Sequence, residues 1–365
     1  MKILFLIPRM GGGGAERVVS IIANGLCRLP EYHVKIATLV SNESFYPLNE
    51  NVIFESADFS VNRKNKCTRI MSLASNFLGA IKYVRKQLNS YKPDITISFL
   101  NEMDIVVNIA RWHIKSIYIC SERNDPSHRN RYLQKLLEHI YKRSNMLVCQ
   151  SREVYNYYSM VSEKRKIVIP NPIDLKKCPS RVPEFSPLKI VSVGRLQPQK
   201  NFPILIKSFG LLSDRFPEVT LTIYGEGSER NNLQKLIDDS NLQDRVFLPG
   251  ADKNILLKIR DASIFVMSSD YEGFPNALVE AIAVGVPVIS TDFPSGVAHE
   301  IISDKVGLVV PCNDADQLAD AICYMLSNTG LREQIRREGY KTIGYLDTEN
   351  IVNKWEAMLK KLTEE

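Results

Sequence analysis

The sequence predicts an α/β protein made of two Rossmann-like domains, each with a doubly wound parallel sheet. Three observations lead to this fold class. The 365 residues exceed one typical domain and fit two domains of Rossmann size. Short apolar runs that suit buried strands alternate with segments of helical length, an order that produces parallel sheets. Several runs end in glycine-containing loops, where such sheets bind ligands.

Composition indicates a globular chain with unevenly distributed charge. Hydrophobic residues make up 44% and charged residues 24% of the chain, as is usual for folded proteins. Residues 1–180 carry 27 basic and 15 acidic side chains, a net +12, whereas residues 181–365 carry 20 and 26, a net −6. This asymmetry predicts that the first half meets an anionic surface. Because no nucleic-acid motif is present, we expect an anionic membrane surface and no nucleic acid.

The seven cysteines indicate a reduced compartment, because they lack the spacing of a zinc site or a disulfide framework. Pro8 ends the opening apolar run early, so the run predicts a strand and not a signal peptide. No stretch of about 18 apolar residues could span a membrane. We therefore expect a cytoplasmic protein, peripheral on the inner face of the plasma membrane.

The first half alternates strands with helices. We predict a helix that ends near Leu29 and a basic helix from Cys67 to Tyr91. Apolar residues recur in the basic helix at three- and four-residue spacing, which suits the protein core better than a membrane. The cations of residues 63–86 nevertheless suit docking on an acidic bilayer. The predicted strands cover residues 2–7, 32–40, 95–100, 116–120 and 146–149.

Four glycines, Gly11 to Gly14, follow the first predicted strand. Glycine lets backbone amides come close to a ligand at the start of a helix. The segment is not the dinucleotide fingerprint, because Glu16 or Arg17 stands where the third glycine belongs. A tight turn of any α/β domain explains it equally well at this point.

The second half repeats the same alternation. Its strands are predicted at residues 188–193, 221–224, 245–250 and 263–267. The first of them runs into a loop that carries Gly194, Arg195 and Lys200. A guanidinium and an ammonium at such a loop suit a diphosphate, although two exposed cations would be the simpler explanation.

The segment from Asp270 to Glu280 joins a strand to a helix that we expect to begin near Pro275 or Asn276. The first amides of that helix face the carboxyl end of the sheet and suit a phosphate. Glu272 and Glu280 bracket this position and would repel a phosphate unless they face something else, such as sugar hydroxyls. The alternative is an ordinary loop with two solvated acids.

Together these segments resemble the family-4 glycosyltransferases, retaining enzymes of the GT-B fold that use nucleotide sugars. The resemblance rests on five segments in the order of that family: residues 13–17, 169–174, 194–201, 272–280 and 291–300. It points to the branch with bacterial polysaccharide and lipid-linked oligosaccharide enzymes. It implies two domains facing a central cleft, an acceptor domain over 1–180 and a nucleotide-sugar domain over 181–345. A final helix, 346–365, would pack back on the first domain.

The resemblance also implies the site residues. The catalytic group is Glu272, Arg195, Lys200 and Arg123. Donor binding involves Gly13, Gly14, Gly194, Arg195, Lys200, Gly225, Leu248, Glu272, Gly273, Phe274, Pro275, Asn276, Ala277, Leu278 and Glu280. The acceptor side comprises Gly12, Gly13, Glu16, Arg17, Arg123, Asn124 and His128. Glu280 would bind the ribose, Glu272 the sugar, and Arg195, Lys200 and the amides of 276–278 the diphosphate.

Arg123 departs from the family, whose members commonly carry a histidine there. Arginine stays charged near neutral pH and cannot exchange a proton. We therefore expect Arg123 to act electrostatically, with the departing phosphate as the base. His128 is close enough in sequence to need its own test.

No metal and no cofactor are expected. Asp314-Ala315-Asp316 has the D-x-D spelling of a metal motif from another glycosyltransferase fold. It follows Pro311 and opens a predicted helix over 314–327, so we interpret it as a helix cap.

The sequence thus predicts a retaining glycosyltransferase of cell-surface polysaccharide synthesis. It would move a sugar from a nucleoside-diphosphate sugar, with UDP favoured, to a glycan or polyprenyl-linked acceptor. One alternative is a nucleotide-sugar epimerase or hydrolase, which would consume the donor without an acceptor. The other is a non-catalytic nucleotide-sugar-binding protein.

Overall fold

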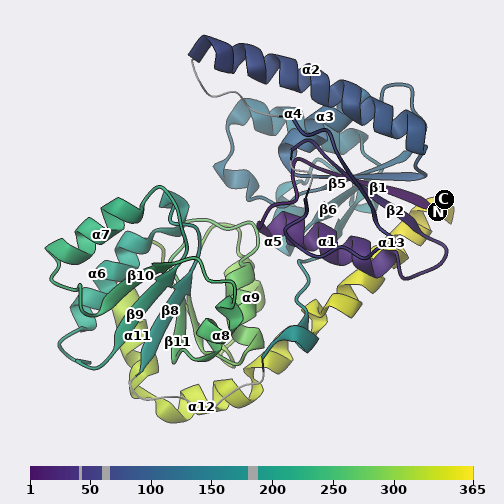
Figure 1. Ribbon diagram of the computed structural model, residues 1–365. Coiled ribbons are helices and arrows are strands. Elements are labelled where there is room, and N and C mark those ends of the chain that lie inside the picture. Colours follow the sequence, from purple (N-terminus) through teal and green to yellow (C-terminus); the bar gives the residue numbers. More distant parts are fainter. Residues whose placement is uncertain (41–42, 60–65, 180–187, 365) are drawn as a thin grey trace. The chain divides into compact units, whose positions relative to one another are not determined.

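The computed structural model describes residues 1–40, 43–59, 66–179 and 188–364, and the side chains of its longest helix from Asn76 onward. The chain forms two compact units (Figure 1). The first unit contains Met1–Pro172 and Thr348–Glu365, and the second contains Ile173–Asp347.

The first unit contains a seven-stranded parallel sheet with the order β3-β2-β1-β4-β5-β6-β7. Its strands are β1 (Lys2–Ile7), β2 (His33–Thr38), β3 (Ile53–Ser56), β4 (Ile95–Phe99), β5 (Ile117–Ser121), β6 (Met146–Cys149) and β7 (Lys166–Val168). Its helices are α1 (Gly14–Leu26), α2 (Lys66–Tyr91), α3 (Asn101–Ala110), α4 (Arg131–Arg143), α5 (Arg152–Tyr157) and α13 (Thr348–Glu364).

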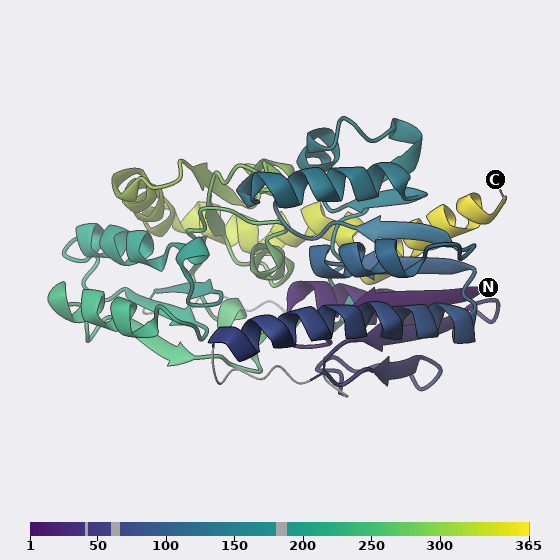
Figure 2. The same ribbon diagram turned by 90° about the horizontal axis from the view of Figure 1, so that it is seen from above.

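Alternation along β1 explains why this sheet has helices on both faces. Ile3, Phe5 and Ile7 belong to a core shared with α1 and α13. Leu4 and Leu6 belong to a second core with α2, α3 and α4. Successive side chains of a strand point to opposite faces, so a nearly continuous apolar run requires a helical layer on each side. Figure 2 looks onto α2, α3 and α4, which lie in front of the sheet.

The second unit contains a six-stranded parallel sheet with the order β10-β9-β8-β11-β12-β13. Its strands are β8 (Lys189–Val193), β9 (Thr220–Tyr224), β10 (Val246–Gly250), β11 (Ile264–Met267), β12 (Val288–Thr291) and β13 (Gly307–Val310). Its helices are α6 (Phe202–Leu212), α7 (Arg230–Asp239), α8 (Ile255–Arg260), α9 (Asn276–Ala283), α10 (Val297–Ile301), α11 (Ala315–Ser327) and α12 (Thr329–Glu338). Ile190 packs with α6, α7 and α11, and Val191 packs with α8, α9 and α10.

The predicted α/β class with two parallel sheets is confirmed. The unit boundary nevertheless lies earlier than the predicted residue 180. The amide of Ile173 donates to the carbonyl of Leu346 at 2.9 Å, and the amide of Leu175 donates to the Asp347 carboxylate at 3.2 Å. These bonds hold residues 173–175 in the second unit. The predicted linker stretch 180–187 lies outside the described residues.

The last helix, α13, belongs to the first unit. Ile351, Trp355, Met358 and Leu359 are buried in the core that also contains α1 and β1. The contact with α1 is close, because a Cβ on Gly25 would lie 2.5 Å from a methyl carbon of Val352. Glycine at position 25 therefore lets the two helices approach.

Among the described residues, no helix has both the length and the apolar character needed to cross a bilayer.

Candidate active site

The second unit gathers the predicted donor residues at the carboxyl edge of its sheet. Gly194 follows β8, and Gly225 follows β9. A Cβ on Gly225 would lie 1.8 Å from the carbonyl oxygen of Gly194, and Gly225 has a φ of +148°. Only glycine fits this approach. The glycine turn therefore lets the ends of the two strands converge on the loop that carries Arg195.

Lys200 and Glu272 form an ion pair at this edge. The ammonium of Lys200 hydrogen bonds to the Oε1 of Glu272, and the Ser269 hydroxyl donates to the same oxygen at 2.6 Å. The Glu272 side chain is 8% exposed and that of Lys200 16% exposed. A buried carboxylate requires such partners. The predicted diphosphate cation and the predicted sugar-binding acid are therefore directly connected.

Two further contacts hold the Lys200 loop against the Glu272 loop. The Gln199 side-chain amide donates to the Tyr271 carbonyl at 2.8 Å. The Asn201 side-chain amide donates to the Asp270 carboxylate at 2.7 Å. Asn201 has a φ of +42°, a backbone conformation that asparagine tolerates better than most residues. The two loops thus form one assembly at the ends of β8 and β11.

Helix α9 begins at Asn276, as the sequence predicts. The amides of Asn276 and Leu278 already donate to the carbonyls of Phe274 and Pro275, at 3.0 Å each. A phosphate at this helix start would therefore have to share these two amides. Phe274, Pro275 and Leu278 are buried, so they shape the loop.

The remaining predicted donor residues of the second unit lie around this assembly. Arg195 is exposed, while Glu280, Gly273 and Ala277 are half-buried. Leu248 is buried in β10, and its carbonyl accepts a hydrogen bond from Arg230 at 2.7 Å. Glu280 lies on α9, about one turn after the first residue of that helix.

In the first unit, the glycine turn covers a carboxylate. Glu16 is 5% exposed, and its side chain reaches back to Gly13, where a Cβ would lie 2.3 Å from Glu16 Oε2. Arg9 Nε lies 3.6 Å from Glu16 Oε1. A carboxylate is favourable at the positive start of α1. The Glu16 carboxylate thus lies beside Gly13 at the start of α1, while Gly12 is exposed and Arg17 is half-buried.

Arg123 lies in the interior of the first unit, with 7% of its surface exposed. Its guanidinium lies over the rings of Phe99 and Trp355, 5.3 and 5.9 Å from their centres. It donates to Ser121 Oγ and Asn171 Oδ1 at 2.8 Å each. Burial lowers the pKa of Arg123 to about 9, so the group remains charged at neutral pH. Its Nη2 is buried without a hydrogen-bond partner among the described residues.

The loop after Arg123 is held by a buried carboxylate. Glu122 accepts hydrogen bonds from the amide of Asn124, the guanidinium of Arg129 and the hydroxyls of Tyr141 and Tyr158, at 2.5 to 3.0 Å. Burial alone would raise the pKa of Glu122, but Arg129 and these hydrogen bonds lower it overall. The loop thus presents Asn124 and His128 as exposed residues.

Comparison with known proteins identifies both halves of the chain. Residues 12–177 match the family model described as glycosyltransferase family 4, and residues 181–342 match the model for glycosyl transferases group 1. The chain belongs to the family-4 glycosyltransferases.

The curated relatives of this glycosyltransferase include two Campylobacter jejuni enzymes. One is N-acetylgalactosamine-N,N'-diacetylbacillosaminyl-diphospho-undecaprenol 4-alpha-N-acetylgalactosaminyltransferase, 28% identical over 92% of this chain and 93% of that protein. The other is GalNAc-alpha-(1->4)-GalNAc-alpha-(1->3)-diNAcBac-PP-undecaprenol alpha-1,4-N-acetyl-D-galactosaminyltransferase, 26% identical over 99% of both chains. These matches favour sugar transfer over epimerisation, hydrolysis or donor sensing.

Solved structures share the fold of this glycosyltransferase. Sucrose-phosphate synthase from Thermosynechococcus elongatus has a TM-score of 0.84 at 18% identity and covers 100% of both chains. HepE from Anabaena, solved in complex with UDP, has a TM-score of 0.78 at 18% identity and covers 99% of this chain and 100% of its own. These likenesses establish the GT-B fold.

The D-x-D segment of this glycosyltransferase is a helix cap, as predicted. The Asp314 carboxylate accepts from the amide of Gln317 at 2.9 Å at the start of α11, and this bond lowers the pKa of Asp314. The described residues contain no cluster of three or more histidine, cysteine, aspartate or glutamate side chains that could hold a metal.

Sequence reasoning missed Ser269 and Glu122. Ser269 lies between β11 and Glu272, and its only signal was a small polar residue directly after a strand. Glu122 had a stronger signal, because an acid directly after a buried strand needs cationic or hydroxyl partners. The sequence does not show which arginine and tyrosines supply them.

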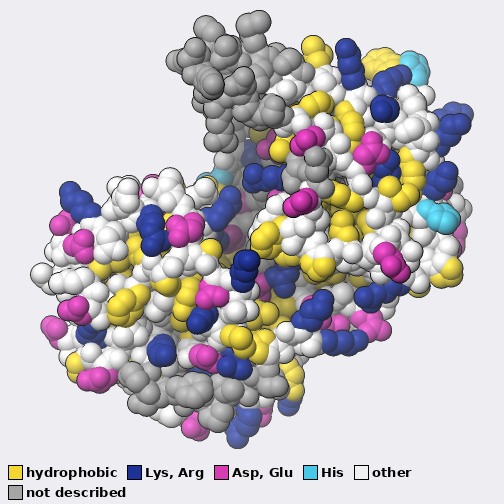
Figure 3. Space-filling view, viewed as in Figure 1, with side chains coloured by type: hydrophobic (Ala, Val, Ile, Leu, Met, Phe, Trp, Pro, Cys, Tyr) yellow, Lys and Arg dark blue, Asp and Glu magenta, His cyan; other side chains and the backbone are white. Residues whose placement is uncertain are grey.

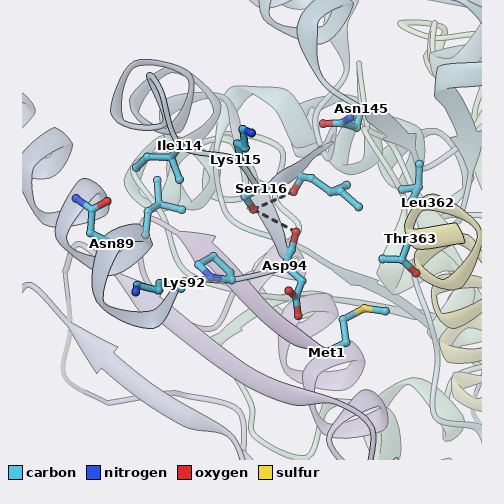
Figure 4. Close-up of a pocket in the computed structure, with 13 residues that line it drawn as sticks. Met1, Asn89, Lys92, Asp94, Ile114, Lys115, Ser116, Asn145, Leu362 and Thr363 are labelled. Atoms are coloured by element: carbon cyan, nitrogen blue, oxygen red, sulfur yellow. Dashed lines mark hydrogen bonds between the residues drawn. The ribbon is translucent and has the colours of Figure 1, made fainter. Parts of the chain in front are cut away.

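A separate hollow of about 1020 Å³ lies in the first unit at the amino ends of β1, β4 and β5 (Figure 4). Met1, Lys92, Asp94, Ser116 and Thr363 are among the residues that line it. The candidate site residues of this unit follow the carboxyl ends of β1 and β5. The hollow therefore lies at the opposite edge of the sheet.

Proposed function

We propose that this glycosyltransferase moves a sugar, with retention of configuration, from a nucleoside-diphosphate sugar to a lipid-linked or glycan acceptor in bacterial cell-surface polysaccharide synthesis. The observation that carries the proposal is the ion pair of the half-buried Lys200 and the buried Glu272, beside the exposed Arg195 and the start of α9. Cations for a diphosphate and an acid for sugar hydroxyls stand together in one assembly.

The reaction requires no group from outside the two substrates. The bond between the sugar C1 and the diphosphate oxygen breaks, and the acceptor oxygen forms a new bond to C1 on the same face. The acceptor proton passes to the departing phosphate oxygen. Lys200 and Arg195 would stabilise the negative charge that develops on that phosphate. We therefore propose metal-independent transfer.

Glu272 and Glu280 would orient the donor. The carboxylate of Glu272 is fixed by Lys200 and Ser269, so it can accept hydrogen bonds from sugar hydroxyls in a defined direction. Glu280, further along α9, would accept from the ribose. On the acceptor side, we propose Gly12, Glu16, Arg17, Asn124 and His128 as contacts.

UDP is the favoured nucleotide of the donor, because HepE was solved with UDP and UDP-glucose. The Campylobacter jejuni relatives carry undecaprenyl-linked acceptors in their names, which supports a polyprenyl-linked acceptor and a peripheral location at the cytoplasmic membrane face.

Thermal unfolding with a panel of UDP and GDP sugars tests the proposal. A ligand at 100 times its Kd stabilises the folded state by about 2.7 kcal/mol, so the true donor should raise the melting temperature clearly. Lys200→Ala should remove that increase. No stabilisation by any nucleotide sugar, with the protein folded, would contradict the proposed donor class.

A further inference from the structure

Helix α4 turns a face of basic and apolar side chains to solvent. Its exposed side chains are Arg131, Tyr132, Lys135, Leu136, His139, Lys142 and Arg143. At 100° per residue they occupy one arc of the helix, opposite the buried Gln134, Leu137 and Tyr141. The structure describes all of α4, and none of its exposed side chains is acidic. Glu138 is half-buried and accepts from Gln134 at 3.2 Å.

The start of this arrangement is unfavourable for an isolated helix, whereas Lys142 and Arg143 in the last turn suit the helix dipole. Arg131 and Lys135 are like charges at i and i+4, where opposite charges would stabilise the helix. Arg131 also lies at the positive start of the helix dipole. Tyr132 is 84% exposed and Leu136 45% exposed. An ordinary solvated face would mix both signs of charge, so this face suits an anionic partner that also accepts apolar groups.

The neighbouring helices extend the same surface. Arg85 of α2 donates to the carbonyls of Ala110 and Trp112, at 3.1 Å each, and so joins α2 to the end of α3. Among the described side chains of α2, α3 and α4, Glu102 is the one exposed acid. The other exposed side chains of α2, α3 and the turn after α3 include Leu78, Lys82, Arg85, Lys86, Ile109, Trp112 and Lys115.

The figures show how this surface is placed in the first unit. Figure 2 shows the three helices side by side on one face of the sheet. Figure 3 shows lysines and arginines close to apolar side chains, with a few acidic side chains among them, in the upper part of the first unit that is not grey. The layer therefore presents a broad mixed basic and apolar face.

We propose that the outer face of α2, α3 and α4, centred on α4, docks on an anionic lipid bilayer. The cations would pair with lipid phosphates, and Tyr132, Leu136 and Trp112 would enter the headgroup region. Weak apolar contacts become a stable membrane association when basic residues add to them. The inference rests on the membrane partner proposed above, and it does not depend on the sugar-transfer chemistry.

An anionic bilayer explains more of this surface than a soluble polyanion does. A phosphate polymer would use the cations and leave Tyr132 and Leu136 in water. Both side chains gain from transfer to the boundary between headgroups and acyl chains. The apolar side chains should therefore contribute to binding of a bilayer and not to binding of a soluble polyanion.

Sedimentation with vesicles tests the cationic part. We compare phosphatidylcholine vesicles with and without phosphatidylglycerol, using the wild type and the triple variant Arg131→Glu, Lys135→Glu and Lys142→Glu. At about 1 kcal/mol for each cation near the surface, the partition coefficient onto acidic vesicles should fall by about 100-fold. The control is a second triple variant with the same net charge as the first. It changes three exposed residues of the second unit, by Lys207→Glu, Lys235→Glu and Arg337→Glu. It should retain most of the binding.

A second variant tests the apolar part. Tyr132→Ser with Leu136→Ser should lower vesicle binding at high salt as well, because apolar contacts are not screened. Its retention on immobilised heparin should stay unchanged. Equal thermal stability of all variants, with and without UDP, confirms that the fold and the donor site are intact.

The outcomes separate the two proposals. If the wild type does not bind acidic vesicles at low salt, the membrane partner of the proposed function is wrong, and this inference is wrong with it. If the wild type binds and the α4 triple variant binds equally, the docking surface lies elsewhere. If the triple variant loses heparin retention but keeps vesicle binding, the basic face serves a soluble polyanion.

Discussion

Variants of the ion pair between Lys200 and Glu272 can separate its contribution to stability from its contribution to sugar transfer. Replacing Lys200 with methionine keeps the length of the side chain and removes the ammonium. The buried Glu272 then retains the Ser269 hydroxyl on its Oε1 and loses its charged partner. A buried charge without its partner is costly.

The expected cost follows from the strength of one charge-assisted hydrogen bond in a partly exposed pair. We expect Lys200→Met to lower the free energy of unfolding of the second unit by about 2 to 3 kcal/mol. This corresponds to a melting temperature lower by roughly 4 to 12 °C. The double variant Lys200→Met with Glu272→Gln should recover most of this loss, because the neutral amide no longer needs a cation. Sugar transfer should fall by at least ~10² in both variants.

Far-UV circular dichroism is the suitable measurement, since both tryptophans, Trp112 and Trp355, belong to the first unit. The control is Lys207→Met, at an exposed lysine of α6, which should change stability by less than about 0.5 kcal/mol. A double variant no more stable than Lys200→Met would refute the reasoning. So would a double variant that regains transfer.

Three further outcomes are expected. Gly25→Ala should destabilise the first unit, because the new Cβ would meet Val352 at 2.5 Å, whereas Gly330→Ala, with no heavy atom within 4 Å of its Cβ, should be neutral or slightly stabilising in thermal unfolding. Glu122, whose pKa is lowered overall despite its burial, stabilises the fold above its unfolded-state pKa and loses this effect as pH falls through the folded value. In urea unfolding, the Glu122→Gln variant should therefore have a lower free energy of unfolding than the wild type at pH 7. Its free energy of unfolding should also fall less steeply than that of the wild type below about pH 5. Parallel curves of this free energy against pH would contradict the argument. Transfer activity should survive EDTA, and recovery that requires Mg²⁺ or Mn²⁺ would contradict metal independence.

The sequence could not predict the surroundings of Arg123 in the folded protein. The resemblance, with an arginine where a histidine is common, implied an electrostatic role toward a substrate, and this role stays a prediction. The structure adds that the guanidinium lies over Phe99 and Trp355 and donates to Asn171. Trp355 lies on α13, far away in the sequence, so no local pattern could show this stacking. We expect Arg123→Lys to retain more stability and more activity than Arg123→Ala, because lysine keeps the charge.

The strands were more accessible to prediction than the contacts between loops. Lys2–Ile7 and Met146–Cys149 have the predicted bounds because each is a buried apolar run. β3 was missed because Ile53–Ser56 is an edge strand with an exposed first residue and three half-buried ones, so it lacks that pattern. Lys200 and Glu272 could both be placed at the carboxyl edge of one sheet. The two residues are 72 positions apart in the sequence, and their ion pair depends on the positions of two loops. The spacing of apolar residues predicts strands and helices but not the positions of loops.

The place of α13 also determines the order in which the chain can mature on the ribosome. The second unit is one continuous segment, Ile173–Asp347, whereas the first needs Thr348–Glu365 as well. While residues 173–347 are being synthesised, α13 does not yet exist. Trp355 therefore cannot pack beside Phe99 and Arg123, and apolar side chains of α1 and β1 lack the cover that α13 gives them. Domains generally fold as units when their chain is complete. We therefore expect the core of the first unit to be completed only after the second unit has been translated.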